Sequence, residues 1–179
     1  MRLRPGGTAD LDAIMALERA SFQGDAWSET AMRAELASPH NHYIVAEQAG
    51  RLVGYAGLRA PDGAKDADVQ TIALDRSARG RGRGRTLFRA LLAEASRRGV
   101  REVFLDVRAN NPPAQRLYAS EGFLEIGRRP NYYPDGNVDA PSSGPRAGSR
   151  LPRREPPTRR ESPPPPGAAF APGGRLPRR

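Results

Sequence analysis

The feature that most constrains this sequence is a run of alternating arginine and glycine between a strand and a helix. Val69, Thr71, Ile72 and Leu74 are β-branched or apolar residues in a run of strand length, whereas apolar residues from Leu87 onward recur at helical spacing. Gly80, Gly82 and Gly84 fall between these elements and let the backbone approach a ligand closely. Because a helix N-terminus offers free N–H groups to an anion, the junction predicts a loop that binds phosphate or pyrophosphate.

The arginines of the loop strengthen this interpretation without making it unique. Arg79, Arg81, Arg83 and Arg85 add guanidinium donors that suit a phosphate group. A solvated basic loop or an RG-type RNA contact is the simpler alternative, but the strand before and the helix after favour a phosphate site. A Walker loop would need lysine where Arg85 stands, whereas a dinucleotide fingerprint with Asp106 as its acidic residue stays open.

The composition excludes several kinds of catalytic and metal-binding site. The chain has no cysteine, which excludes disulfides, Cys-based metal sites and an acyl-cysteine intermediate. Its two histidines, His40 and His42, fall in a predicted loop, so we expect no metal site. No signal peptide and no apolar run of about 20 residues is visible, which predicts a cytoplasmic protein without membrane contact.

The net charge of +9 is concentrated at the C-terminal end of the chain. Ala140–Arg179 holds nine arginines and two glutamates, a charge of +7, which leaves +2 for Met1–Asp139. The same segment holds 11 of the 18 prolines and few large apolar residues, so it cannot bury enough surface to offset its chain entropy. We therefore predict a folded domain at 1–140 and a disordered basic tail at 141–179, either a solvated appendage or a weak contact to RNA or the ribosome.

The rest of the body predicts an α/β sheet of about six strands. A strand–helix–strand order makes Val69–Leu74 and Val103–Val107 parallel neighbours through a right-handed crossover. The other elements follow from apolar spacing and capping residues: a strand at Met1–Arg4, helices beginning near Thr8 and Ser28, a hairpin over Tyr43–Leu58, a helix capped by Asn110 or Asn111, and a strand from Phe123.

Two motifs, in this order, resemble the GCN5-related N-acetyltransferases. The first is Arg79-x-x-Gly82-x-Gly84, which is similar to the pyrophosphate loop of that family. The second, Asn111–Phe123, matches the family pattern Asn-x-x-Ala-x-x-Leu-Tyr-x-x-x-Gly-Phe. Ala26-Trp27-Ser28 and Arg128–Pro134 further resemble the RimI branch, the ribosomal-protein-alanine N-acetyltransferases. The resemblance covers Arg2 to Ala140.

This resemblance implies a mixed sheet with flanking helices, in which two parallel central strands splay around acetyl-coenzyme A, the acetyl donor. The backbone of Ile72, Ala73 and Leu74 would hold the pantetheine and the acetyl carbonyl, and Asn111 would contact the cofactor again. The pyrophosphate would lie on the glycine loop, formed by Arg79, Gly80, Arg81, Gly82, Arg83, Gly84 and Arg85.

The resemblance also implies catalytic roles. Tyr118 stands in the place of the acid that protonates the leaving thiolate, although a helical tyrosine by itself is more often packing. Asp106 stands in the place of a general base that is usually glutamate; its shorter side chain would act through a water. Trp27, Tyr132 and Tyr133 would line the groove for the acceptor peptide, although such aromatics are often core or surface residues.

The sequence departs from the family after Ala140. The family continues into a final apolar strand, whereas here Pro141-Ser142-Ser143-Gly144-Pro145 follows, so we expect that strand to be missing. We predict acetyl transfer to the N-terminal α-amine of a protein, a ribosomal-protein alanine, by direct attack in a ternary complex. The alternatives are acetylation of a small amine or a lysine, and a catalytically degenerate module that binds RNA or the ribosome.

Overall fold

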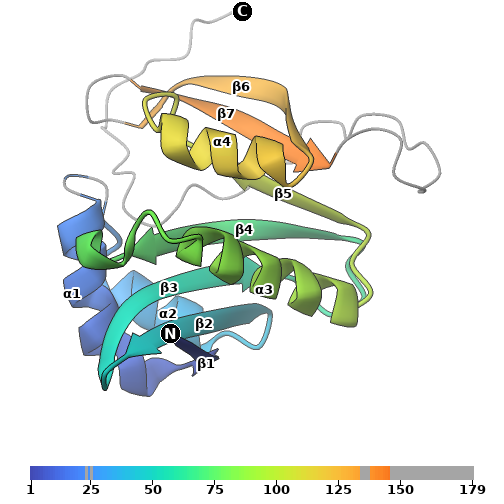
Figure 1. Ribbon diagram of the computed structural model, residues 1–179. Helices are drawn as coiled ribbons and strands as arrows, with labels where there is room; N and C mark the ends of the chain where they lie inside the picture. The colour runs from blue at the N-terminus through green and yellow to red at the C-terminus, as the bar shows by residue number, and fades with distance from the viewer. Residues whose placement is uncertain (23, 25, 134–137, 146–179) are drawn as a thin grey trace, which may run out of the picture.

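The computed structural model describes residues 1–22, 24, 26–133 and 138–145 (Figure 1), and it describes the side chains of all of these except 128–133, 138–140 and 145. The elements run in the order β1 (Arg2–Gly6), α1 (Leu11–Ser21), α2 (Glu29–Ala37), β2 (Asn41–Gln48), β3 (Arg51–Arg59), β4 (Asp66–Leu74), α3 (Arg83–Arg97), β5 (Glu102–Asp106), α4 (Pro112–Ser120), β6 (Phe123–Tyr133) and β7 (Val138–Pro145). Two short 3-10 helices, at Thr8–Asp10 and Arg76–Ala78, precede α1 and the glycine loop.

One mixed sheet holds all seven strands in the order β1-β2-β3-β4-β5-β7-β6. The pair β4 and β5 is parallel and every other neighbouring pair is antiparallel. Pairing between β4 and β5 covers only Asp66–Val69 with Glu102–Leu105, after which the strands diverge, as Figure 1 shows. The predicted sheet, with two parallel central strands that splay apart, is therefore confirmed.

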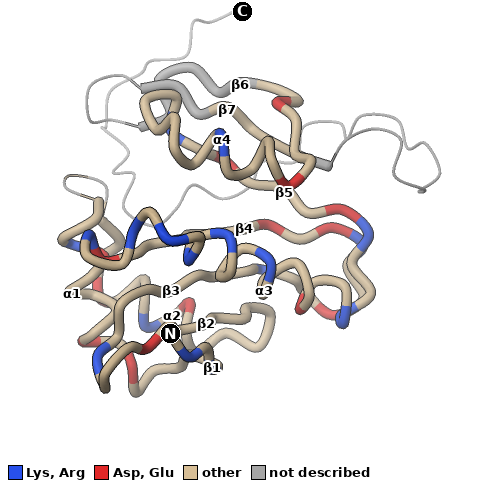
Figure 2. Tube along the Cα trace, in the orientation of Figure 1, with Lys and Arg blue, Asp and Glu red and all other residues tan. Residues whose placement is uncertain are grey.

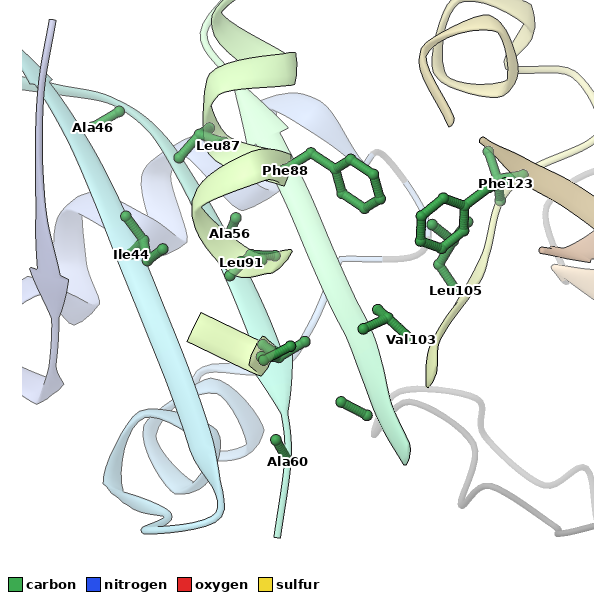
Figure 3. Packing of buried hydrophobic residues seen from close by; sticks show 14 of the residues in the cluster. Ile44, Ala46, Ala56, Ala60, Leu87, Phe88, Leu91, Val103, Leu105 and Phe123 are labelled. Carbon is green, nitrogen blue, oxygen red and sulfur yellow. The ribbon is translucent and has the colours of Figure 1, made fainter. Parts of the chain in front are cut away.

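Helices cover both faces of β2, β3 and β4. The side chains of β2 alternate, so that Tyr43 and Val45 face α1 and α2 while Ile44 and Ala46 face α3. On the face under α1 and α2, one cluster packs Leu11, Ile14, Met15, Leu17, Trp27 and Met32 onto the sheet. On the opposite face, the other cluster packs Leu87, Phe88, Leu91 and Ala95 of α3 onto the sheet (Figure 3). These inner strands are therefore buried on both faces.

Phe88 joins this part of the sheet to the rest of the fold. Its buried ring extends from α3 toward β6 (Figure 3). It makes edge contacts with Tyr118 of α4, at a centroid distance of 5.0 Å, and with Phe123 of β6, at 5.1 Å. These pairs combine buried area with favourable edge-to-face geometry, so they fix α4 and β6 against α3.

The prediction that the final strand is missing is wrong. β7 lies between β5 and β6, with Leu105 opposite Ser143 and Asp106 opposite Ser142, and the Val107 N–H donates to the Pro141 carbonyl at 3.1 Å. Strand pairing requires extended backbone, whereas apolar alternation is required only for burying a face, and the prediction relied on the second criterion.

The small side chains of β7 fit its crowded position. A Cβ placed on Gly144 would lie 3.1 Å from Ile126 Cδ1 and 3.1 Å from Phe104 Cε1, so a larger residue would force these neighbours apart. β7 also continues past residue 140, the predicted end of the domain. The predicted disorder of the tail beyond Pro145 concerns residues 146–179, which lie outside the described residues.

Candidate active site

β4 and β5 are not paired beyond Val69 and Leu105, and the diverging part of the two strands is called the opening below. On its other side β4 stays paired with β3, but Gly57 pairs with Thr71 and Leu58 with Val69, which leaves Gln70 as an extra residue. Such a β-bulge bends its strand and increases its twist, and here it lies where the β4–β5 pairing ends. Beyond it, the β5-facing edge of β4 over Ile72, Ala73 and Leu74 is not paired with β5, as expected for a backbone that receives a ligand.

The glycine loop closes one end of this opening. Gly80 and Gly82 have φ of +78° and +71°, in the left-handed region that glycine adopts without strain. Gly82 is the N-cap of α3, and the Thr86 N–H donates to the Gly82 carbonyl at 3.0 Å. The N–H groups before Thr86 in the first turn have no acceptor within the helix, so they are available to an anion.

Gly84 serves a different purpose from the other two glycines. It lies inside α3, and a Cβ placed on it would contact Leu117 Cδ2 at 3.5 Å and Leu74 Cδ1 at 3.6 Å. These are ordinary packing distances. A small residue here lets the first turn of α3 lie close to α4 and to the end of β4.

The four predicted cofactor-binding arginines divide into two pairs. Figure 2 shows that Lys and Arg positions are frequent along the glycine loop and α3. Arg79 donates from Nε to the Leu74 carbonyl at 3.0 Å. Arg85 contacts Glu121 at 2.8 Å and donates to Ser120 Oγ at 2.9 Å. Arg81 and Arg83 make no hydrogen bond or ion pair with other residues in the described part of the chain, which leaves their guanidinium groups for a phosphate.

Glu121 is a site residue that the sequence did not reveal. Its side chain is 9% exposed and lies 2.8 Å from Arg85 Nε and 2.9 Å from Arg89 Nε. The hydrogen bond from Arg89, followed by the charge of both arginines, lowers the pKa of the Glu121 carboxyl. Glu121 thus ties the end of α4 to the first turns of α3. In the sequence, the only indication of this role of Glu121 is its position directly before Gly122.

Asp106, the predicted base, ends β5 where the strands diverge. Ser142 of β7 donates from Oγ to Asp106 Oδ1 at 2.5 Å. The Asp106 side chain is partly buried.

Tyr118, the predicted acid, lies on α4 with its ring against Phe88. Burial raises the pKa of its hydroxyl to about 12. The phenol therefore stays protonated at neutral pH, as a proton donor must.

Asn111, predicted to contact the cofactor, caps α4. Its Oδ1 accepts from the Ala114 N–H at 3.2 Å, which fixes the side chain and leaves the amide NH₂ to point elsewhere.

The predicted acceptor-binding aromatics lie in different environments. Trp27 is 7% exposed and packs in the cluster under α1 and α2, and its backbone N–H donates to Glu18 Oε1 at 3.0 Å. Tyr132 and Tyr133 belong to β6, and their side chains lie outside those that the structure describes. The role of all three in acceptor binding stays a prediction.

Glu18 is a second residue that sequence analysis missed. It is buried at 1% exposure and accepts hydrogen bonds from the Trp27 N–H and from the Tyr55 hydroxyl, which lies 3.4 Å from Thr71 Oγ1. Burial raises the pKa of the Glu18 carboxyl. The group joins α1, β3 and β4 on the face opposite α3, behind the segment of β4 that borders the opening.

The described residues contain no group of three or more His, Cys, Asp or Glu side chains that could hold a metal ion. His42 lies in β2 rather than in the predicted loop, with its Nδ1 3.7 Å from Glu94 Oε1. Among the described helices, none has both the length and the apolar composition needed to cross a membrane.

Comparisons with known proteins agree with this geometry. Residues 11–123 match the model of the Acetyltransferase (GNAT) family. The chain is 44% identical over 137 residues to the N-alpha-acetyltransferase RimI of Mycobacterium tuberculosis, which covers 74% of this chain and 84% of that protein. It is 33% identical over 135 residues to the ribosomal protein bS18-alanine N-acetyltransferase of Escherichia coli, which covers 74% of this chain and 88% of that protein.

Solved structures show the same arrangement. The crystal structure of the ribosomal-protein-S18-alanine N-acetyltransferase from Escherichia coli superposes with a TM-score of 0.73 at 30% identity, over 85% of this chain and 99% of that one. YncA of Salmonella typhimurium, solved with its cofactor acetyl-CoA, superposes with a TM-score of 0.70 at 20% identity, over 86% of this chain and 98% of that one.

Proposed function

We propose, from the premise that this chain belongs to the GNAT family of acetyl-CoA-dependent N-acetyltransferases, that it acetylates the N-terminal α-amine of a ribosomal protein, at an alanine. The acceptor class is supported by the names of relatives such as the bS18-alanine N-acetyltransferase of Escherichia coli. A ribosomal acceptor in turn places the enzyme in the cytoplasm.

The observation that carries the proposal is the opening between β4 and β5 with the N-terminus of α3 at its end. These residues fit acetyl-CoA, because within the described part of the chain a strand edge without a β-strand partner, left-handed glycines and two arginines without a hydrogen-bond or ion-pair partner provide donors for an amide-rich and phosphate-rich ligand. The β4 edge over Ile72–Leu74 would hold the pantetheine. The backbone from Gly80 into the first turn of α3, with Arg81 and Arg83, would hold the pyrophosphate.

Acetyl-CoA, when bound, supplies an activated thioester carbonyl. Asp106 accepts the proton that the attacking amine must lose, through a water because its side chain is short. Backbone N–H groups of β4 stabilise the charge that develops on the carbonyl oxygen. As the new C–N bond forms and the C–S bond breaks, the Tyr118 hydroxyl gives its proton to the sulfur. The absence of cysteine from the chain agrees with direct transfer in a ternary complex.

The acceptor is tested with three substrates supplied at equal concentration with acetyl-CoA. The first is a ribosomal N-terminal peptide that begins with alanine, the second is the same peptide with a blocked N-terminus and an added internal lysine, and the third is a polyamine. We expect mass spectrometry to show acetyl on the first peptide alone. Preferential modification of the lysine peptide or the polyamine would instead support the small-amine or lysine alternative.

Titration calorimetry with acetyl-CoA separates the enzyme from a degenerate binding module. We expect Asp106→Asn to bind acetyl-CoA like the native chain and to lose turnover by about 10²-fold, the usual scale of general base catalysis. Asp106→Glu should retain or raise turnover, because its longer side chain reaches the amine more directly. Binding without any transfer by the native chain would contradict the proposed function.

The division of the chain into a catalytic domain and a basic tail belongs to the same proposal. The sheet continues to Pro145, so the tail would begin after that residue rather than after Ala140. Removing residues 146–179 should leave acetylation of a short peptide unchanged. It should weaken any salt-sensitive association with ribosomal RNA, because the tail carries most of the net charge.

A further inference from the structure

β7 brings a hydroxyl group to the predicted catalytic base. Ser142 and Asp106 are direct partners across the β5–β7 ladder, and Ser142 Oγ lies 2.5 Å from Asp106 Oδ1. The resemblance noted in the sequence implies an apolar strand at this place, so the hydroxyl is a feature of this chain. Strand pairing alone does not explain this side-chain hydrogen bond.

The alternation of side chains shows why Ser142, and not its neighbour, meets Asp106. Leu105 and Ser143 are buried partners, and Leu105 belongs to the cluster under α3. Ser142 and Asp106 therefore lie on the opposite face of the sheet. Gly144 lies on that face as well, because its Cβ position meets the Phe104 ring at 3.2 Å or less.

The contact has a defined direction and length. Ser142 Oγ donates to Asp106 Oδ1, and the donor–acceptor distance of 2.5 Å lies at the short end of the range for O–H···O hydrogen bonds. Because Ser142 belongs to a strand held on both sides, the bond fixes the rotamer of Asp106 relative to the sheet.

We propose that Ser142 is a positioning residue for Asp106, whose carboxylate it holds in the orientation that receives a proton at the mouth of the β4–β5 opening. The inference rests on the proposed function, in which Asp106 is the base. A base that acts through a water gains most from fixed geometry, since small displacements of catalytic groups can lower rates by up to about 10²-fold.

The test compares Ser142→Ala with Ser143→Ala in the full chain. We expect Ser142→Ala to lower kcat about tenfold with the KM for acetyl-CoA unchanged, because cofactor binding does not involve the Asp106 rotamer. Ser143→Ala changes the neighbouring residue on the other face and should leave kcat unchanged. Equal losses of kcat from both variants, with equal losses of melting temperature, would show a merely structural strand and overturn the proposal.

A second pair of variants keeps the test decisive if Ser142→Ala does not fold. Threonine and valine have nearly the same shape and both suit a strand, but only threonine has a hydroxyl. We expect Ser142→Thr to retain kcat and Ser142→Val to lose it. Equal kcat values for the two variants would overturn the proposal.

A double-mutant cycle separates this inference from the proposed function. In the Asp106→Asn background, Ser142→Ala should cause no further loss, because Ser142 acts only through Asp106. A full tenfold loss in that background would overturn the positioning role. If Asp106→Asn alone leaves kcat unchanged, the assignment of the base fails; if Asp106→Asn lowers kcat and Ser142→Ala does not, only the positioning role fails.

Discussion

The two halves of the sheet are stabilised in different ways. β1 to β4 form the first half, and its inner strands carry α1 and α2 on one face and α3 on the other. β5, β7 and β6 form the second half, where α4 packs near β6 and where the described exposed side chains include Leu124 at 45% and Ile126 at 57%. The inner strands of the first half are buried on both faces, whereas the second half adds Val103, Leu105, Val107 and Phe123 to the cluster under α3 and otherwise depends on backbone pairing.

This difference predicts which property a substitution in each half should change. In the proposed function, the first half would present the backbone that receives the cofactor, so its changes should alter stability or cofactor affinity. The second half and α4 would contribute Asp106, Tyr118 and Ser142 to catalysis, so changes there should alter turnover. Phe88 lies at the joint between the halves.

We expect the largest effect from a substitution of Phe88, which connects the two halves. Phe88→Ala removes a fully buried ring that contacts Tyr118 and Phe123, and we expect a loss of about 3–5 kcal/mol in the free energy of unfolding. Urea unfolding measures it. Phe104→Ala, which removes a partly buried ring in the second half, should cost clearly less. Equal losses would show that the second half is stabilised by burial to the same degree as the first.

Removal of the Tyr118 hydroxyl should separate turnover from stability. We expect Tyr118→Phe to lower kcat by about 10²-fold with little change in the affinity for acetyl-CoA, because the proton is needed only as the thiolate leaves. Steady-state kinetics at saturating cofactor measures the loss. The matched change in the first half, Tyr43→Phe, should leave kcat intact. Unchanged turnover in Tyr118→Phe would assign the ring to packing.

The loop arginines should divide according to their contacts. Replacing Arg81 and Arg83 together by alanine should weaken acetyl-CoA binding about tenfold without lowering the melting temperature, since neither has a partner among the described residues. Calorimetry at two salt concentrations should show that part of the loss depends on salt. Arg85→Ala should instead lower the melting temperature, because Glu121 loses a partner. The same loss of affinity in both variants would indicate an undivided charge patch.

The smallest effect concerns pH and is confined to the first half. Burial raises the pKa of Glu18, so its contribution to stability is fully present below the ordinary glutamate pKa and is lost as the pH rises through the folded-state value. Glu18→Gln should therefore remove part of the decline in unfolding free energy on going from pH 5 to pH 8.

Glu94 provides the control of opposite sign. Hydrogen bonds from Arg97 and then Arg98 lower the pKa of Glu94 to about 2, so its contribution is present above the ordinary pKa and is lost as the pH falls toward 2. Glu94→Gln should flatten the acid side of the stability profile and leave the change between pH 5 and pH 8 as it is. The measurement is urea unfolding from pH 2 to pH 8. The same change of stability with pH in both variants would contradict the assignment.

Local patterns in the sequence predicted the elements near the opening. The spacing of Gly80 and Gly82 before an apolar helix identified a loop in which both residues adopt left-handed backbone. The strand–helix–strand order predicted that β4 and β5 are parallel. These inferences succeeded because each depends on residues close together in the chain.

Contacts between distant residues were not predictable in the same way. Arg85 and Glu121 meet only because α3 and α4 pack together, so a residue counted as a cofactor ligand proved to have a partner inside the protein. Glu18 occurs among apolar residues of α1, and nothing nearby indicates its partner Tyr55. β7 was missed because its residues lack apolar alternation, although its backbone pairs on both sides.

The insertion of β7 between β5 and β6 also sets an order of assembly. β1 to β4 follow one another in the chain and pair as neighbours, so they can form while the rest is still unfolded. β5 and β6 cannot be bridged until the last strand of the sheet has been made, and each exposes an unpaired edge until then. A chain cut short before Val138 would therefore have a folded β1–β4 half, while the unpaired edges of β5 and β6 would be open to association with other chains.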